Sequence, residues 1–274
     1  MENRLELILS QNKRFRNIHS GERCFILGNG PSLKDVDLSL LADEFVFTVN
    51  NFAFVDGFEK AKTNVHLLMD LAFFNARNDV KLEKEKLMSS YTKIATQKPI
   101  CFVDIQGLPF VKQNKLDDIL QINYLYQGIN SIASNSPLYL DISKPITGFY
   151  NVIHYAIVIA IFMGFKNIYL LGCDTTGILE NVNSYLNLPI VDDHAYSAPE
   201  NVSKINKQVV DNLGMTHIFF GHYCIFLGYD KLYYICKNLL KVDLINCSSQ
   251  TLITSIPRKN LSDILGRRTT ILQR

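Results

Sequence analysis

The feature that most constrains the fold is a series of short apolar runs, rich in Val, Ile, Phe and Tyr, separated by segments long enough to form helices. This spacing is typical of a parallel sheet that is covered by helices on both faces. The runs occupy residues 23–27, 45–49, 65–69, 100–103, 168–171 and 242–245, and residues 124–126 form a weaker one. We therefore predict an α/β fold with a Rossmann-like, doubly wound and mostly parallel sheet.

Three segments between these runs are predicted to be helices, namely residues 81–93, 152–163 and 229–240. As a helix, residues 152–165 would span about 21 Å, less than the roughly 30 Å hydrocarbon layer of a membrane, so we interpret them as a buried helix. Residues 146–148 are expected to lie at the start of this buried helix. No repeat or flexible linker divides the chain, so residues 1–274 are predicted to form a single domain. Residues 175–222 lack a strong period and are interpreted as a lid or insertion.

The composition is typical of a globular protein, since 47% of the 274 residues are apolar and 20% are charged. The formal net charge is only +2, so a nucleic-acid partner is not expected. The six cysteines have no metal-type spacing and are predicted to be buried, reduced thiols of a cytoplasmic protein. The first residues are polar and lack the apolar core of a signal peptide, so secretion is not expected.

Polar residues follow almost every apolar run. They are Gly28 to Ser32, Asn50, Asp70, Asp104, Asp174, and the pair Ser248 and Ser249. In an open parallel sheet these positions share the carboxyl edge, where the crevice at the strand-order switch binds ligands. The pattern therefore predicts a polar ligand site at this edge.

The turn Gly28-Asn29-Gly30-Pro31-Ser32 is the most informative of these polar segments. Its glycines permit a positive φ and a close approach to a ligand, Pro31 suits the first turn of a helix, and exposed N–H groups there suit a phosphate. The turn matches neither the dinucleotide-binding glycine fingerprint nor the Walker A loop. A plain strand-to-helix turn would need the glycines but not Asn29 and Ser32, so we favour ligand binding.

Asp70, Asp104 and Asp174 each have an alternative role as caps of the segment that follows. Three aspartates on one sheet edge exceed what capping requires. They are interpreted as ligands of Mg²⁺ for phosphoryl chemistry or as partners of sugar hydroxyls.

Two of the six histidines are candidates for a general base. His194 and His222 lie in the irregular segment, where a loop can carry a base over the sheet edge, although a plain surface loop explains either one as well. His66 and His154 lie in apolar segments and are predicted to be core residues.

Four pieces of the chain, taken in order, resemble the bacterial sialyltransferases of glycosyltransferase family 42. The resemblance spans roughly residues 20 to 265 and extends to a wider group that includes the MptE-like hydroxymethylpterin pyrophosphokinases. The pieces are Gly28-Asn29-Gly30-Pro31-Ser32-Leu33-Lys34, Val49-Asn50-Asn51-Phe52, Ile146-Thr147-Gly148, and Met163-Gly164-Phe165-Lys166-Asn167-Ile168-Tyr169-Leu170-Leu171-Gly172-Cys173-Asp174.

The resemblance implies a Rossmann-like domain with a lid that binds a CMP-activated sugar and transfers it with inversion, without a metal or other cofactor. It implies that His222, in the pair Gly221-His222, is the base, or that His194 supplies the base with Tyr196 as a phosphate ligand. Thr176 and Tyr185 stand where the family has two phosphate-binding tyrosines. The resemblance also implies that the substrate is bound by Asn29, Gly30, Ser32, Asn50, Thr147, Gly148, Ser248 and Ser249. Gly28, Asp70 and Asp174 are further substrate-binding candidates from their positions after the apolar runs, and Asp70 stands where the family has an asparagine.

Three functions follow as hypotheses. The first is a glycosyltransferase that moves sialic acid or a related nonulosonic acid from a CMP-sugar donor to a bacterial surface glycan, either free or lipid-linked. The second is a pyrophosphokinase-like phosphotransferase that requires Mg²⁺. The third is a non-catalytic nucleotide-binding domain. The basic tail, residues 258–274, is either a solvated segment or a peripheral contact with the inner membrane. The oligomeric state stays open.

Overall fold

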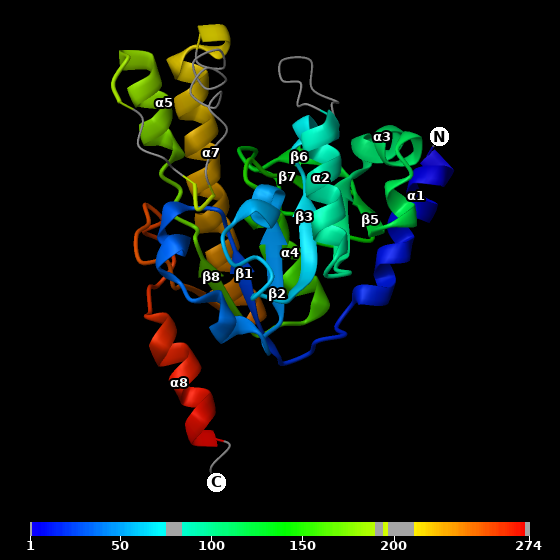
Figure 1. Cartoon of the computed structure of the whole chain (residues 1–274). Helices are drawn as coiled ribbons and strands as arrows, with labels where there is room; N and C mark the ends of the chain where they lie inside the picture. Colours follow the sequence, from blue (N-terminus) through cyan, green and yellow to red (C-terminus); the bar gives the residue numbers. More distant parts are fainter. Residues whose placement is uncertain (1, 75–83, 190–193, 197–210, 272–274) are drawn as a thin grey trace.

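A parallel sheet forms the centre of the computed structural model, which describes residues 2–74, 84–189, 194–196 and 211–271 (Figure 1). The sheet has seven strands in the described part of the chain, in the order β5-β4-β3-β2-β1-β8-β9, and every neighbouring pair is parallel. The strands are β1 (Arg23–Leu27), β2 (Val46–Val49), β3 (Thr63–Leu68), β4 (Ile100–Asp104), β5 (Gln121–Leu125), β8 (Asn167–Leu171) and β9 (Asp243–Asn246).

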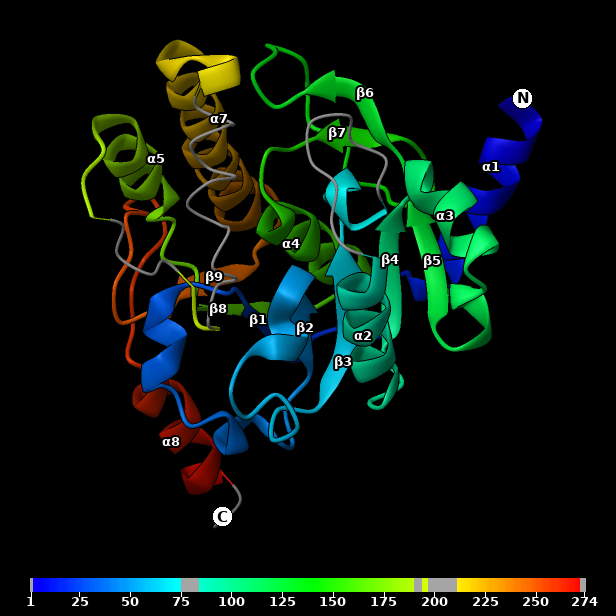
Figure 2. The ribbon, with the colours of Figure 1, turned by 45° about the horizontal axis from the view of Figure 1, so that its top comes forward.

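The sheet is buried on both faces because successive side chains of each strand point in opposite directions. In β1, Cys24 and Ile26 join one apolar core, while Phe25 and Leu27 join another on the opposite face. Helices cover both faces, as Figure 2 shows, with α4 (Val152–Met163) and α7 (Met215–Tyr234) contributing to the first core and α2 (Lys84–Ala95) to the second. The predicted α/β, doubly wound parallel sheet is therefore confirmed.

The central helix α4 has the bounds that the sequence predicts, and the reason is local. The side chain of Asn151 accepts a hydrogen bond from the Ile153 N–H and caps the first turn, while Gly164 ends the helix with φ of 96°. Nearly every side chain between these two residues is buried, which confirms that the apolar stretch is a core helix. Among the described residues, no helix combines the length and apolar character needed to cross a membrane.

Two elements differ from the sequence-based expectation. Residues 146–148 do not open α4 but form β7 (Ile146–Gly148), which pairs with β6 (Gln127–Ser131) in a separate two-stranded parallel sheet. The Asn151 cap separates this strand from the helix. Helix α7 begins at Met215, earlier than residue 229, and continues into a π-helical turn, Ile235–Leu240.

Part of the segment interpreted as a lid is regular. It contains α5 (Gly177–Leu186) and the first turns of α7, which lie side by side beyond the carboxyl edge of the sheet (Figure 1). Residues 190–193 and 197–210 of that segment lie outside the described residues.

Three other α-helices of the described ranges are α1 (Glu2–Ser10), α3 (Leu108–Gln113) and α8 (Leu261–Ile271). Helix α8 carries the C-terminal segment away from the sheet (Figure 1). At its base, the Arg258 guanidinium donates to the carbonyls of Ser248 and Ser249, so this arginine has a structural contact. The side chains of Arg267, Arg268 and Arg274 lie outside the described part, and the membrane contact of the tail stays a prediction. All six cysteines are buried and free of disulfides, as expected.

Candidate functional site

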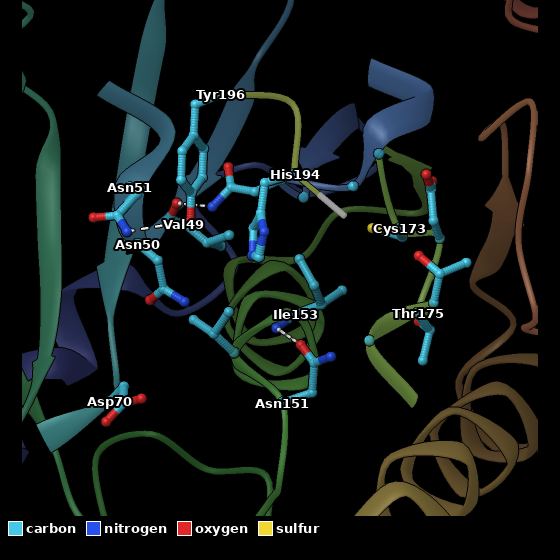
Figure 3. Close-up of a pocket in the computed structure, with 18 of the residues that line it drawn as sticks. Val49, Asn50, Asn51, Asp70, Asn151, Ile153, Cys173, Thr175, His194 and Tyr196 are labelled. Carbon is cyan, nitrogen blue, oxygen red and sulfur yellow. Dashed lines mark hydrogen bonds between the residues drawn. The ribbon is translucent and has the colours of Figure 1, made fainter. Parts of the chain in front are cut away.

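A cavity of about 340 Å³ lies where the strand order reverses, between β1 and β8, at the carboxyl edge of the sheet (Figure 3). This is the position at which open α/β sheets bind ligands. We call it the first cavity. It brings together nine of the residues that sequence reasoning selected: Gly28, Asn29, Gly30, Asn50, Asp70, Asp174, Thr176, His194 and Tyr196.

The loops after β1 and β8 pack tightly against each other and form one wall of the first cavity. The Gly28 N–H donates to the Leu171 carbonyl at 2.7 Å, and the Gly30 N–H donates to the Gly172 carbonyl at 2.8 Å. A Cβ on Gly30 would lie 2.6 Å from the Asp174 Cγ. Neither Gly28 nor Gly30 has a positive φ, so that part of the expectation is wrong. These glycines are needed because two backbones meet.

Asp174 lines the first cavity and also holds this wall together. Its buried carboxylate accepts hydrogen bonds from the Ser32 N–H, at 2.7 Å, and from the Ser32 hydroxyl. The backbone N–H groups of Gly28, Gly30 and Ser32 are therefore already bonded within the protein. The expectation that they are exposed to a phosphate is wrong for these three groups.

Two asparagine side chains supply unpaired acceptors at the cavity wall. The Asn29 amide donates to the Val49 carbonyl at 3.1 Å, whereas its Oδ1 atom and that of Asn50 are buried without a hydrogen-bond partner. A buried polar atom in this state costs about 1–3 kcal/mol. Asn50 has φ of 49°, in the left-handed region that asparagine tolerates better than most residues. N–H or O–H groups of a ligand are the partners that these oxygens lack.

His194 and Tyr196 line the first cavity, and hydrogen bonds join residues 194–196 to its wall. The Ala195 N–H donates to the Asn29 carbonyl at 2.7 Å, and the Tyr196 hydroxyl accepts from the Asn51 amide at 3.2 Å. The ring of His194 lies 4.9 Å from that of Tyr196, measured between centroids. Figure 3 shows both side chains on the cavity, with Asn50 and Asp70 on one side and Thr175 on the other.

His222, the other predicted base, lies on α7 and does not line the first cavity. Its Nε2 atom is 2.8 Å from the Asn181 Oδ1 on α5, and burial lowers the pKa of the ring below its usual value. The expectation that a loop carries this histidine is wrong, since a helix does. Tyr185 is also away from the cavity, with 56% of its surface exposed on α5.

Five further predicted residues have structural contacts outside the first cavity. The Thr147 hydroxyl accepts from the Tyr139 N–H at 2.9 Å, and Gly148 pairs with Ser131 in the small sheet. The Ser248 hydroxyl accepts from the Cys173 N–H at 2.9 Å. Together with Ser32, the residues Ser248 and Ser249 line a separate cavity of about 700 Å³ between the β1 loop and α8.

The three aspartates do not form one cation site. Asp104 is buried beneath the edge, accepts from the Gln106 N–H at 2.8 Å, and has a pKa raised by burial. Asp174 binds Ser32, and only Asp70 and Asp174 line the first cavity. Within the described ranges, no three His, Cys, Asp or Glu side chains gather closely enough to hold a metal ion.

Among the lining residues of the first cavity that carry an amide or hydroxyl group, the sequence did not single out Asn51, Asn151, Thr175 and Tyr229 as site residues. Asn151 carries a readable signal, because an asparagine directly before an apolar helix is a typical N-cap. Thr175 adopts φ of 59°, which is rare for a β-branched residue and has no sequence signal. Tyr229 reaches the cavity from α7, so its role depends on tertiary packing.

No family model matches the chain, and no curated protein matches it. Among solved structures, the chain is similar to the sialyltransferase CstII from Campylobacter jejuni, solved in complex with a substrate analogue, cytidine-5'-monophosphate. The identity is 17%, the similarity covers 87% of this chain and 85% of that chain, and the TM-score is 0.47. It is also similar to the MAf glycosyltransferase from Magnetospirillum magneticum AMB-1, at 14% identity and a TM-score of 0.45. That similarity covers 99% of this chain but only 41% of the other.

Proposed function

We propose that the protein is an inverting glycosyltransferase that takes sialic acid or a related nonulosonic acid from a CMP-activated donor and transfers it to a hydroxyl of a bacterial surface glycan. The observation that carries this proposal is the polar cavity at the switch between β1 and β8. Three of the four segments that carry the sequence resemblance meet there, since Gly28 to Gly30, Asn50 and Asp174 all line it, and only the segment 146–148 does not.

The first turn of α4 supports the binding of one phosphate group. Asn151, Val152 and Ile153 line the first cavity, so the helix begins at its wall (Figure 3). The N-terminus of a helix carries about half a positive charge and favours an anion. None of the described residues that line the cavity is Lys or Arg. This environment suits the single phosphodiester of a CMP-sugar better than the several charges of ATP.

Hydroxyl groups and one imidazole support the transfer step. Thr175 and Tyr196 line the first cavity and have hydroxyls that can donate to the phosphate oxygen as the leaving group departs. His194 lines the same cavity, and a neutral imidazole can take the proton of the acceptor hydroxyl. Of the two histidines that the sequence selects, we therefore assign the base to His194.

The proposal is tested by the thermal stability of the protein with CMP, UDP, GDP or ATP, each with and without Mg²⁺. A ligand that binds only the folded chain at a hundred times its Kd stabilises it by about 2.7 kcal/mol. We expect CMP alone to raise the Tm. A response limited to ATP with Mg²⁺ would support a phosphotransferase instead, and no response to any nucleotide would contradict the proposal.

Two matched variants refine the test with a CMP-sugar as substrate and CMP release as the readout. His194→Ala is expected to slow release by about a hundredfold or more, as the loss of a general base does. His222→Ala removes a histidine outside the cavity and is expected to have a much smaller effect. If His222→Ala slows CMP release more than His194→Ala does, His222 is the general base instead.

A further inference from the structure

A second cavity of about 340 Å³ adjoins the first and shares four of its residues. The shared residues are Asn50, Asp70, Asn151 and Val152. The two cavities therefore have a common boundary at the end of β3 and the start of α4. A molecule in the second cavity would contact a molecule in the first at this boundary.

Three residues that line the second cavity are held together by hydrogen bonds. The buried Tyr155 hydroxyl accepts from the Phe149 N–H at 2.7 Å and is hydrogen-bonded to the side chain of Gln127. Gln127 begins β6 and Phe149 follows β7, so these bonds join the small sheet to α4. All three residues line the cavity. The hydrogen bonds between the small sheet and α4 therefore fix the shape of the second cavity.

The groups around the second cavity match a neutral polyhydroxyl ligand. Asp70 and the amides of Asn50, Gln127 and Asn151 line it, and carboxylate and amide groups hydrogen-bond hydroxyls. Tyr150 lines it, has 45% of its surface exposed and packs edge-to-face with Phe220, and an aromatic ring of this kind can pack against the apolar side of a sugar ring. The described lining residues include no Lys, Arg or His, so a second phosphate would find no cationic side chain here.

Asp70 occupies the common boundary. Its Oδ1 atom accepts from the Ala72 N–H at 2.9 Å, which orients the carboxylate at the end of β3. A carboxylate offers about four acceptor positions, so it can also accept from the hydroxyl of a ligand. A hydroxyl held at this point would lie between the two cavities, where an acceptor has to meet a donor.

We propose that the second cavity is the acceptor subsite, that it binds a neutral sugar residue against Tyr150, and that Asp70 holds the reacting hydroxyl. This inference rests on the proposed function, because it takes the first cavity as the donor site. It assigns no proton transfer to Asp70, which is a binding and orienting residue.

The test measures the binding of a panel of methyl glycosides to the CMP-bound protein by saturation-transfer NMR. The panel contains neutral β-galactoside, β-glucoside and N-acetyl-β-galactosaminide probes. We expect at least one to bind, with a Kd that rises tenfold or more in Tyr150→Ala and in Asp70→Asn. The Kd of CMP is expected to change less than twofold in Tyr150→Ala, because Tyr150 lines the second cavity and not the first, whereas Asp70 lines both. Tyr139→Ala is the matched control, because Tyr139 is 44% exposed and does not line either cavity.

Two results would overturn the inference. If no glycoside of the panel binds, the second cavity is not a neutral sugar site. If Tyr150→Ala weakens CMP as strongly as it weakens the glycoside, the second cavity belongs to the donor. Failure of the wild-type protein to bind CMP would instead contradict the proposed function, and glycoside binding can then still be measured in the absence of nucleotide.

Discussion

Gly30, Ser32 and Asp174 show how single residues shape the candidate site. Asp174 bonds both the N–H and the hydroxyl of Ser32, and Gly30 lets the backbone pass directly over the Asp174 side chain. The contact joins residues that are more than 140 positions apart in the chain. The first cavity therefore depends on the absence of a side chain at position 30 as much as on the polar residues that face it.

Gly30→Ala is expected to destabilise the protein by about 1–3 kcal/mol, as overpacking of a close contact does. The added Cβ would lie within 3.0 Å of both the Asp174 carboxyl group and the Gly172 carbonyl, so the two loops have to separate. CMP binding should weaken in parallel. Chemical denaturation and the CMP-induced shift in Tm measure the two effects.

Gly266→Ala provides the control for this substitution. A Cβ at Gly266 meets no atom within 4 Å, and the residue lies inside α8, where alanine is favoured over glycine by up to about 1 kcal/mol. Equal stability of Gly30→Ala and wild type would show that the loops are not in contact as described.

The sequence pattern selected the residues that form this wall, but it did not reveal the contacts that make those residues necessary. A glycine-rich turn after a strand is a local pattern, and so it is visible in the sequence. The Leu171 and Gly172 carbonyls that bond Gly28 and Gly30 come from a distant strand, and no local pattern reveals that these N–H groups are already bonded. The same limit applies to Ser248, whose hydroxyl bonds the backbone of Cys173.

At the level of elements, α4 and α7 differ in how clearly the sequence marks them. Asn151 and Gly164 cap α4, so its bounds are readable. Helix α7 begins after Gly214 without a side-chain cap, and its apolar residues lie on several faces, so its first turns have no clear signal. Packing supplies what is missing, because Gly228 of α7 lies directly against the ring of His154 on α4.

Gly228→Ala should separate α7 from α4. The new Cβ would lie 2.4 Å from the Cε1 atom of His154, whose ring is buried and lies 4.3 Å from the Tyr229 ring. We expect a loss of about 1–3 kcal/mol in the free energy of unfolding. Urea denaturation measures this loss.

Gly221→Ala is the matched control on the same helix. A Cβ there meets nothing within 4 Å, so alanine should stabilise α7 by up to about 1 kcal/mol. If both variants are equally stable, the helices do not pack through Gly228.

At the level of the whole molecule, the parallel sheet follows directly from the period of the apolar runs, and the small β6–β7 sheet does not. Gln127–Ser131 is polar and half-exposed, so it lacks the buried pattern by which a central strand is recognised. The strand order and the switch point determine where the first cavity lies. Both depend on the pairing of β1 with β2 on one side and with β8 on the other, which the sequence pattern does not predict.

The sheet and its central helix bury two histidines, and this burial makes the whole fold sensitive to acid. Burial lowers the pKa of His66 and of His154 to about 3. An unfolded histidine has a pKa near 6.5. Because the folded pKa is lower, both residues favour the folded state fully above pH 6.5, and this contribution is lost as the pH falls toward 3.

Stability is therefore expected to decrease between pH 7.5 and pH 5, by about 2 kcal/mol for each of the two histidines. His154→Leu removes one of them, so the variant should lose about 2 kcal/mol less than the wild type over the same interval. Urea unfolding of both proteins at pH 7.5, 6 and 5 measures this difference, and the contributions of the carboxylates cancel in it. A stability loss of the same size in the two proteins would mean that His154 is already protonated, or exposed, in the folded chain.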